Sequence, residues 1–258
     1  MAANVRERHH FRLAYGVLAL AFWVSVAGFT YLMTRGGGSD GAKEQWSAWR
    51  PAQSDISGAR EISRHVARAY RADTGGQLVA VQEHPPEIQG LALEAIAIRQ
   101  QSSAGAMDPY IALYGGRRTL IYAFCGLGRN CALAGTATTG RDRLLRREAL
   151  ELALYSFKYI DGIDSVVSLL PPTGSARTTA VFLRKNGLRD LLDRPIRATL
   201  PRAIPPTESQ YAGSEATFVE NVTGPRTFPA QFEALPDGDA ILVLQLGATG
   251  SAGDGTAG

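Results

Sequence analysis

Four arginines lie at the start of the strongest predicted helix of the chain, which we place at residues 141–160. They are Arg141, Arg143, Arg146 and Arg147. Cations in the first turns of a helix oppose the positive end of its dipole, at a cost of roughly some tenths of a kcal/mol each. Their guanidinium groups would suit an anion, such as the phosphate of an envelope polymer or a lipid headgroup. The alternative is a solvated face that Asp142, Glu148 and Glu151 neutralise in part.

The chain contains two cysteines, Cys125 and Cys131, with five residues between them. Outside the cytoplasm such a pair is typical of a disulfide that closes a small loop. Two alternatives stay open at this point. A redox dithiol would favour the Cys-x-x-Cys spacing, and the two thiols could also be free.

Candidates for catalysis or metal binding are sparse. His65 and His84 fit solvated or hydrogen-bonded residues better than a metal pair. Asp161 and Asp164 could pair as carboxylates, although aspartates are also common in turns between a helix and a strand. The sequence contains no GxSxG, HExxH or P-loop motif. We therefore predict no catalytic residue, no metal and no cofactor, and we expect binding rather than catalysis.

Residues 13–34 form an uninterrupted stretch of 22 residues without a charged side chain. At about 1.5 Å per residue, a helix of this length reaches about 33 Å, enough to cross a hydrocarbon core of roughly 30 Å. The sequence therefore predicts a transmembrane signal-anchor helix, with the bilayer as its partner. A cleaved signal peptide is the alternative, since Ser25–Ala27 offers a small-x-small site. A buried helix of a soluble protein is a third.

The charges around this span predict its orientation. Three arginines and one glutamate precede it in the tail at residues 1–12, which places the tail in the cytoplasm and the bulk of the chain outside. The chain has a formal net charge of +3, of which residues 1–34 supply +2 and the remainder only +1. A nucleic-acid partner would need a basic domain, so none is expected. The 24 arginines against three lysines suggest a bacterial protein with a high-GC genome.

The chain after the span divides into three parts. We predict a flexible stalk at 35–55, one extracytoplasmic domain at 56–246 and a disordered tail at 247–258, which is mostly Gly, Ala, Ser and Thr. The stalk carries Trp46 and Trp49, which could rest on the membrane surface or pack back onto the domain.

The predicted domain contains two main helices, one from Ser57 and one at 141–160, each with apolar residues at helical spacing. A capping box at Thr139 to Asp142 starts the second helix, and Gly115-Gly116 predicts a hairpin turn. Strands are predicted at Leu78–Gln82, Leu93–Arg99, Tyr110–Tyr114, Thr119–Phe124, Ser165–Leu170, Thr179–Arg184 and Ala240–Leu246. This order of elements, with short connections, predicts an α+β fold with a largely antiparallel sheet.

Seven of the 13 prolines fall within residues 195–236. We interpret this segment as irregular surface chain with a brief strand at 216–222. Together with the arginine-rich helix, it predicts a contact surface for an envelope protein or polymer. The sequence thus favours a single-pass membrane protein whose exterior domain is a binding or assembly module of the cell envelope. The alternative is an envelope hydrolase with an unrecognised active site.

Overall fold

The computed structural model describes residues 45–88, 90–99, 111–126, 131, 138–171 and 178–245. The predicted cytoplasmic tail, anchor helix and C-terminal tail lie outside these residues. Within the described part, no helix combines the length and the apolar character that a membrane crossing needs. The anchor at 13–34 therefore stays a prediction.

The compact unit begins at Trp46, inside the segment predicted as stalk. Trp46 is buried, and its ring meets the rings of Tyr155 and Tyr159 edge-on at 5.3 and 5.6 Å. The main-chain oxygen of Trp46 also accepts a hydrogen bond from the amide of Ile196. The predicted boundary at 55/56 is corrected accordingly. Both tryptophans pack onto the domain, because an aromatic cluster on the helix at 139–159 receives them.

Nine strands of the described residues form one mixed, mostly antiparallel sheet in the order β1-β5-β6-β7-β8-β9-β3-β2, with β4 paired to β3. Their bounds are β1 Ala80–His84, β2 Glu87–Ile88, β3 Leu91–Arg99, β4 Ile111–Gly115, β5 Thr119–Cys125, β6 Ser165–Leu170, β7 Thr179–Arg184, β8 Thr227–Ala234 and β9 Ala240–Gln245. Only the β3–β9 and β5–β6 pairs are parallel. The predicted α+β class with a largely antiparallel sheet is confirmed.

Five α-helices are described, two of them long. Their bounds are α2 Ile56–Ala67, α3 Thr139–Tyr159, α4 Arg189–Leu192, α5 Ile196–Thr199 and α6 Ser214–Thr223, with short 3₁₀ turns at Lys185–Leu188, Glu208–Gln210 and Gly224–Arg226. Asp55 caps α2 by accepting from two backbone amides of the first turn. Thr138 caps α3 through the amide of Arg141, so the predicted cap at Thr139 was one residue late. Gly162, with φ of +73°, follows α3 as predicted.

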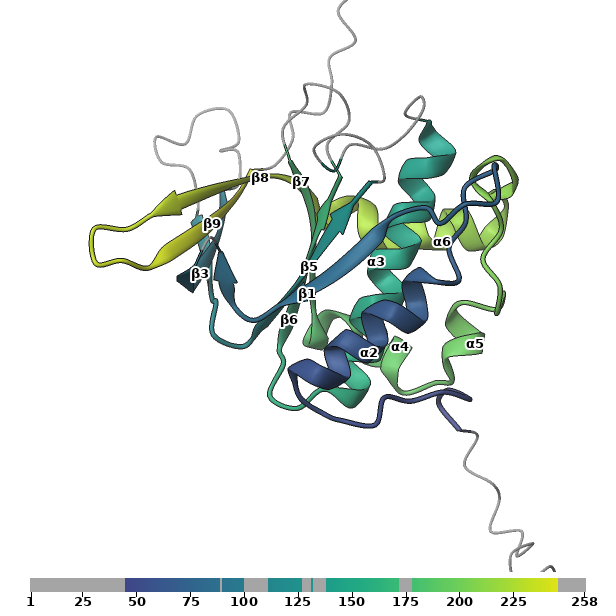
Figure 1. The fold of residues 1–258 in the computed structure, drawn as a ribbon, viewed down its shortest axis with the longest axis horizontal. Coiled ribbons are helices and arrows are strands. Elements are labelled where there is room, and N and C mark those ends of the chain that lie inside the picture. The colour runs from purple at the N-terminus through teal and green to yellow at the C-terminus, as the bar shows by residue number, and fades with distance from the viewer. Residues whose placement is uncertain are drawn as a thin grey trace, which may run out of the picture. The chain divides into compact units, whose positions relative to one another are not determined.

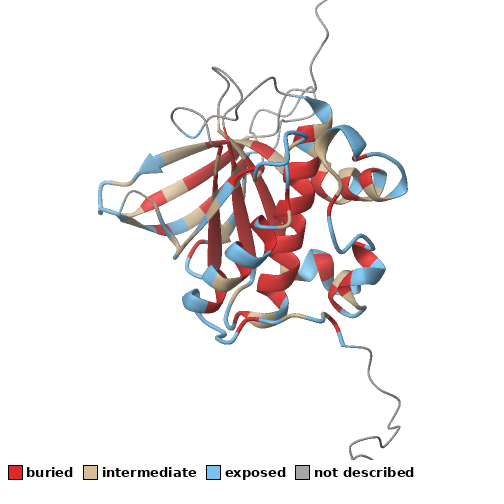
Figure 2. Ribbon diagram, turned by 45° about the vertical axis from the view of Figure 1, so that its right-hand side comes forward, coloured by how far each residue is buried: buried red, intermediate tan, exposed pale blue. Residues whose placement is uncertain are grey.

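Two hydrophobic cores lie on opposite faces of strands β5, β6 and β7. Helices α2, α3 and α6 cover one face, and strands β3, β8 and β9 lie on the other (Figure 1). Helix α3 is the centre of the first core, and nearly every residue from Leu144 to Phe157 is buried (Figure 2). The prediction that α3 buries one broad face was therefore too modest, because helices and sheet enclose it together.

The sheet folds back on itself, so that β4 faces β7 although three strands separate them in the sheet order. Tyr114 of β4 and Phe182 of β7 lie with their ring centres 5.5 Å apart. Residues from both halves of the sheet fill the second core between them. This fold-back brings the end of β4 next to the ends of β6 and β7.

Two local predictions were wrong. Strands β4 and β5 form no hairpin, since β4 pairs with β3 and β5 pairs with β1 and β6. The amide of Gly116 donates to the Glu94 oxygen, and a Cβ at Gly116 would lie 2.1 Å from the Leu93 oxygen. Glycine is needed there for close approach to β3 rather than for a tight turn. Residues 216–222 belong to helix α6, not to a strand.

Candidate functional site

The arginines at the start of α3 bind carboxylates of the chain itself. Arg147 is fully buried and forms ion pairs with Glu151 at 3.0 Å and Glu215 at 2.6 Å. It also donates to the hydroxyl of Tyr70 and to the main-chain oxygen of Arg202. Burial would lower the pKa of Arg147, but its attraction to Tyr70, Glu151 and Glu215 prevails and raises it. This guanidinium group therefore stays charged inside the protein.

The neighbouring arginines follow the same rule with partners from the proline-rich segment. Arg141 makes a two-pronged contact with Glu208, and Arg146 makes one with Glu220. Arg141 and Arg146 are only 8% and 7% exposed. The side chain of Arg143 is 41% exposed and lies 3.6 Å from Glu220.

The arginine-rich helix and the 195–236 segment, both predicted as contact surfaces, therefore bind each other. Both interpretations of Arg141, Arg143, Arg146 and Arg147 missed this burial. The anion site stays a prediction, with internal carboxylates already occupying the positions of an external anion.

Glu148 is the unusual carboxyl group of this network. It is fully buried, and neither side-chain oxygen has a hydrogen-bond partner among the described residues. Burial, supported by repulsion from Glu151 and opposed by Arg147, raises its pKa well above the ordinary value. We therefore assign a neutral, protonated side chain to Glu148.

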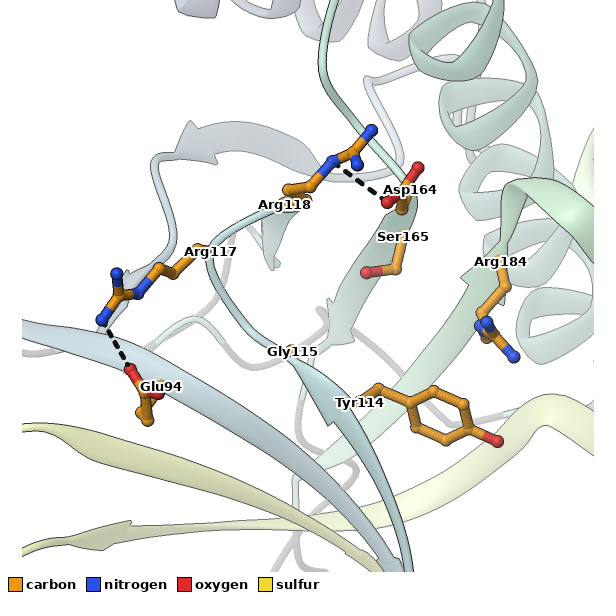
Figure 3. A pocket seen from close by; sticks show the side chains of 8 residues that line it. All are labelled: Glu94, Tyr114, Gly115, Arg117, Arg118, Asp164, Ser165 and Arg184. Atoms are coloured by element: carbon orange, nitrogen blue, oxygen red, sulfur yellow. Dashed lines mark hydrogen bonds and ion pairs between the residues drawn. The ribbon is translucent and has the colours of Figure 1, made fainter.

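A pocket of about 290 Å³ opens where the sheet folds back. Its lining comes from the ends of four strands and the β4–β5 connection, and consists of Glu94, Tyr114, Gly115, Arg117, Arg118, Asp164, Ser165 and Arg184. Figure 3 shows these side chains around the opening. Three cations and two carboxylates leave the pocket with a net charge of +1.

Arg184 and Tyr114 form the recognition pair of this pocket. The guanidinium carbon of Arg184 lies 4.4 Å from the centre of the Tyr114 ring. This cation–π contact orients the guanidinium plane and leaves its N–H groups for other partners. Among the described residues, Arg184 has no carboxylate partner. Arg184 is therefore the cation of the pocket that can bind a ligand without breaking an ion pair.

The other two cations of the pocket are already paired. Arg118 lies 3.0 Å from Asp164 and also donates to the Gly162 oxygen, while Arg117 lies 3.3 Å from Glu94 (Figure 3). Ser165, at the start of β6, shares a 2.7 Å hydrogen bond with Thr119. These contacts hold the rim around Arg184 and make the site suitable for a carboxylate or phosphate group.

A second, shallower groove of about 460 Å³ lies along α2. It is lined by Trp49, Glu61, Arg64, His65, Arg68 and Ala69. The Trp49 and His65 rings stack with centres 3.9 Å apart and an interplanar angle of 4°. Burial lowers the pKa of His65, with contributions from Arg197 and Arg68 that outnumber the opposing effect of Glu151. His65 is therefore held neutral at physiological pH.

The predicted catalytic candidates do not come together. His65 lines the α2 groove and Asp164 lines the sheet pocket. Asp161 accepts a hydrogen bond from Ser54, and His84 pairs with Ile121 in the β1–β5 ladder. No group of metal-ligating side chains is found among the residues described. The geometry therefore supplies no shared cleft for these four residues.

Cys125 at the end of β5 and Cys131 form a disulfide, as predicted. Such a bond is consistent with an extracytoplasmic domain.

The sequence missed Tyr114 and Arg184 as site residues. Each is the last or next-to-last residue of its strand, and 69 positions separate them in the chain. No local motif links them, because only the fold-back of the sheet brings them together. The single available signal was a cation directly after each apolar strand, at Arg117, Arg118 and Arg184.

Comparisons with protein-family models, with curated proteins and with solved structures find no match to this chain.

Proposed function

We propose that this chain is a single-pass envelope membrane protein whose exterior domain binds a carboxylate- or phosphate-bearing group of an envelope protein or polymer. The observation that carries the proposal is the stacked Arg184 in the sheet pocket. It is a guanidinium held in place by Tyr114, with no carboxylate partner among the described residues. An oriented guanidinium can bind an oxyanion through two parallel hydrogen bonds.

The surroundings of Arg184 support an anionic ligand. The net charge of +1 in the pocket favours anions, and the paired Arg117 and Arg118 lie close enough to add long-range attraction. Ser165 offers a hydroxyl group on the opposite side of the opening (Figure 3). The ion pairs on the rim limit the rearrangement that binding would require.

The location rests on two further observations. The charge-free stretch at 13–34, preceded by arginines, supports a membrane anchor with its N-terminus in the cytoplasm. The disulfide between Cys125 and Cys131 supports an oxidising compartment for the domain.

Titration with inorganic phosphate and with acetate tests the pocket. The detergent-solubilised full chain is labelled with ¹⁵N-arginine, and Arg184→Lys assigns the Arg184 side-chain N–H resonance. We expect this resonance to shift and to saturate at millimolar anion concentrations, as befits a small fragment of the ligand. Shifts elsewhere with Arg184 unchanged would refute the site.

Crosslinking in native membranes tests the partner. We expect Arg184→Glu to reduce capture of the wild-type partner at least tenfold, because the substitution reverses the charge that meets the ligand. Arg99→Glu is the matched control, since Arg99 is exposed at the end of β3 and does not line the pocket. Equal losses in both variants would contradict the proposal.

A further inference from the structure

The groove along α2 carries two cations that the fold does not use. Arg64 and Arg68 are exposed, lie four residues apart and line the same groove. Among the described residues, neither has a carboxylate partner. The single carboxylate of the lining, Glu61, is engaged by the amide of Ala52 at 2.7 Å. The groove is therefore positive, in contrast to the neutralised start of α3.

Aromatic side chains accompany these cations. Trp49 is half-buried, with one face stacked on His65 and its edge toward Tyr155 at 5.6 Å. Tryptophan beside arginine is the combination that suits a membrane interface, where one part of a ring is apolar and the headgroups are charged. The neutral His65 adds polar surface without adding charge.

The groove lies next to the point where the chain enters the domain. Tyr155 contacts both Trp46, the first residue of the compact unit, and Trp49 of the groove. Only 11 residues separate the end of the predicted anchor at 34 from Trp46. At about 3.6 Å per residue they span at most about 40 Å. The groove is therefore confined near the bilayer, where even weak contacts are occupied because the local lipid concentration is high.

We infer that the α2 groove docks on the membrane surface by binding the phosphate of anionic phospholipid headgroups between Arg64 and Arg68. This inference rests on the membrane anchor of the proposed function and uses a surface separate from the Arg184 pocket. Docking would hold the domain in one orientation on the bilayer, with the Arg184 pocket left to its own ligand.

Trp49 fluorescence tests the docking in the full chain. The Trp23→Phe protein is reconstituted into vesicles of phosphatidylcholine alone or mixed with phosphatidylglycerol, with lipids brominated near the headgroup as quenchers. We expect quenching of Trp49 in the anionic vesicles and its loss at high salt, since salt screens the attraction. Trp46 contributes a constant background because it is buried.

Substitutions make the test specific. We expect Arg64→Gln with Arg68→Gln to lower the ratio of docked to undocked domains at least about tenfold. Arg99→Gln with Lys185→Gln removes the same charge outside the groove and should leave the quenching unchanged. Arg184→Gln should also leave it unchanged, which separates docking from the proposed pocket.

Three outcomes would overturn the inference. Extraction of the chain from the vesicles by alkaline carbonate refutes the anchor, and the docking with it. A retained chain with unquenched Trp49 refutes the docking alone. Shielding of Trp49 from iodide by a soluble wall teichoic acid, with no quenching by anionic lipid, assigns the groove to a phosphate polymer instead.

Discussion

Arg147 has exchanged its solvent contacts for two carboxylates, a tyrosine hydroxyl and a main-chain oxygen. Buried ion pairs are costly to form and more costly to break, because removal of one partner leaves an uncompensated charge in the interior. The residue is therefore a structural cation, and its position at the start of α3 reflects the packing of the chain rather than ligand binding.

Arg147→Met should lower the free energy of unfolding by about 3–5 kcal/mol, because Glu151 and Glu215 then lose their buried partner. Arg143→Met should cost less than about 1 kcal/mol, since Arg143 is well exposed. Urea unfolding of the full chain in detergent measures both. Arg147→Met combined with Glu215→Gln should recover part of the loss. A cost for Arg147→Met no greater than that of Arg143→Met would refute the structural role.

Glu148→Gln should stabilise the protein at neutral pH. The folded chain keeps a proton on Glu148 at pH values where the unfolded chain has released it, so stability falls as the pH rises above 4.5, the ordinary pKa of glutamate. Glutamine removes this part of the pH dependence. Unfolding measured across pH 4 to 8 should show the advantage of the variant growing with pH. An advantage that is the same at every pH would mean that Glu148 is ionised when folded.

At the scale of elements, the fold joins the proline-rich segment to α3 through charge. The acidic residues Glu208, Glu215 and Glu220 come from a 3₁₀ turn and α6, and each meets an arginine of α3. Charged contacts replace the regular sheet pairing that prolines prevent in this segment. Helix α6 adds Ala216, Val219 and Thr223 to the buried surface.

Weakening these contacts should loosen the segment before it unfolds the domain. Arg141→Gln with Arg146→Gln should raise amide hydrogen exchange in residues 205–224 severalfold, because two charge-assisted contacts are lost. Exchange in α2 and β6 should stay as in the wild type. Arg143→Gln serves as the control for charge alone. Uniform acceleration over the whole domain would show that the segment has no stability of its own.

Local patterns predicted some elements well and others poorly, for identifiable reasons. Strands β6 and β7 were predicted at their observed bounds, because each is a short apolar run with clear breakers on both sides. Helix α6 was mistaken for a strand because Phe218, Val219 and Val222 favour strands. The helical recurrence of Ala216, Val219 and Thr223 was the better signal. The Gly115-Gly116 hairpin failed because the glycines serve a close approach to β3.

At the scale of the whole molecule, the orientation of the chain in the membrane follows from charge. We expect an impermeant maleimide, applied to intact cells after reduction, to label Cys125 and Cys131. The positive-inside arrangement of the first 34 residues places both cysteines outside the cytoplasm. The Cys125→Ser, Cys131→Ser protein controls for labelling of other groups. Labelling that requires cell lysis would reverse the predicted topology.

The sequence by itself determined the α+β class, the two main helices and the disulfide, because periodicity, breakers and cysteine spacing are local signals. It also carries the predictions of an anchor and its orientation. Only the tertiary structure decided which charges are available to a ligand. Arg141, Arg146 and Arg147 find carboxylates 67 to 74 positions away, whereas Arg64, Arg68 and Arg184 have none among the described residues. Charge pairing depends on which distant segments pack together, and no local pattern records that.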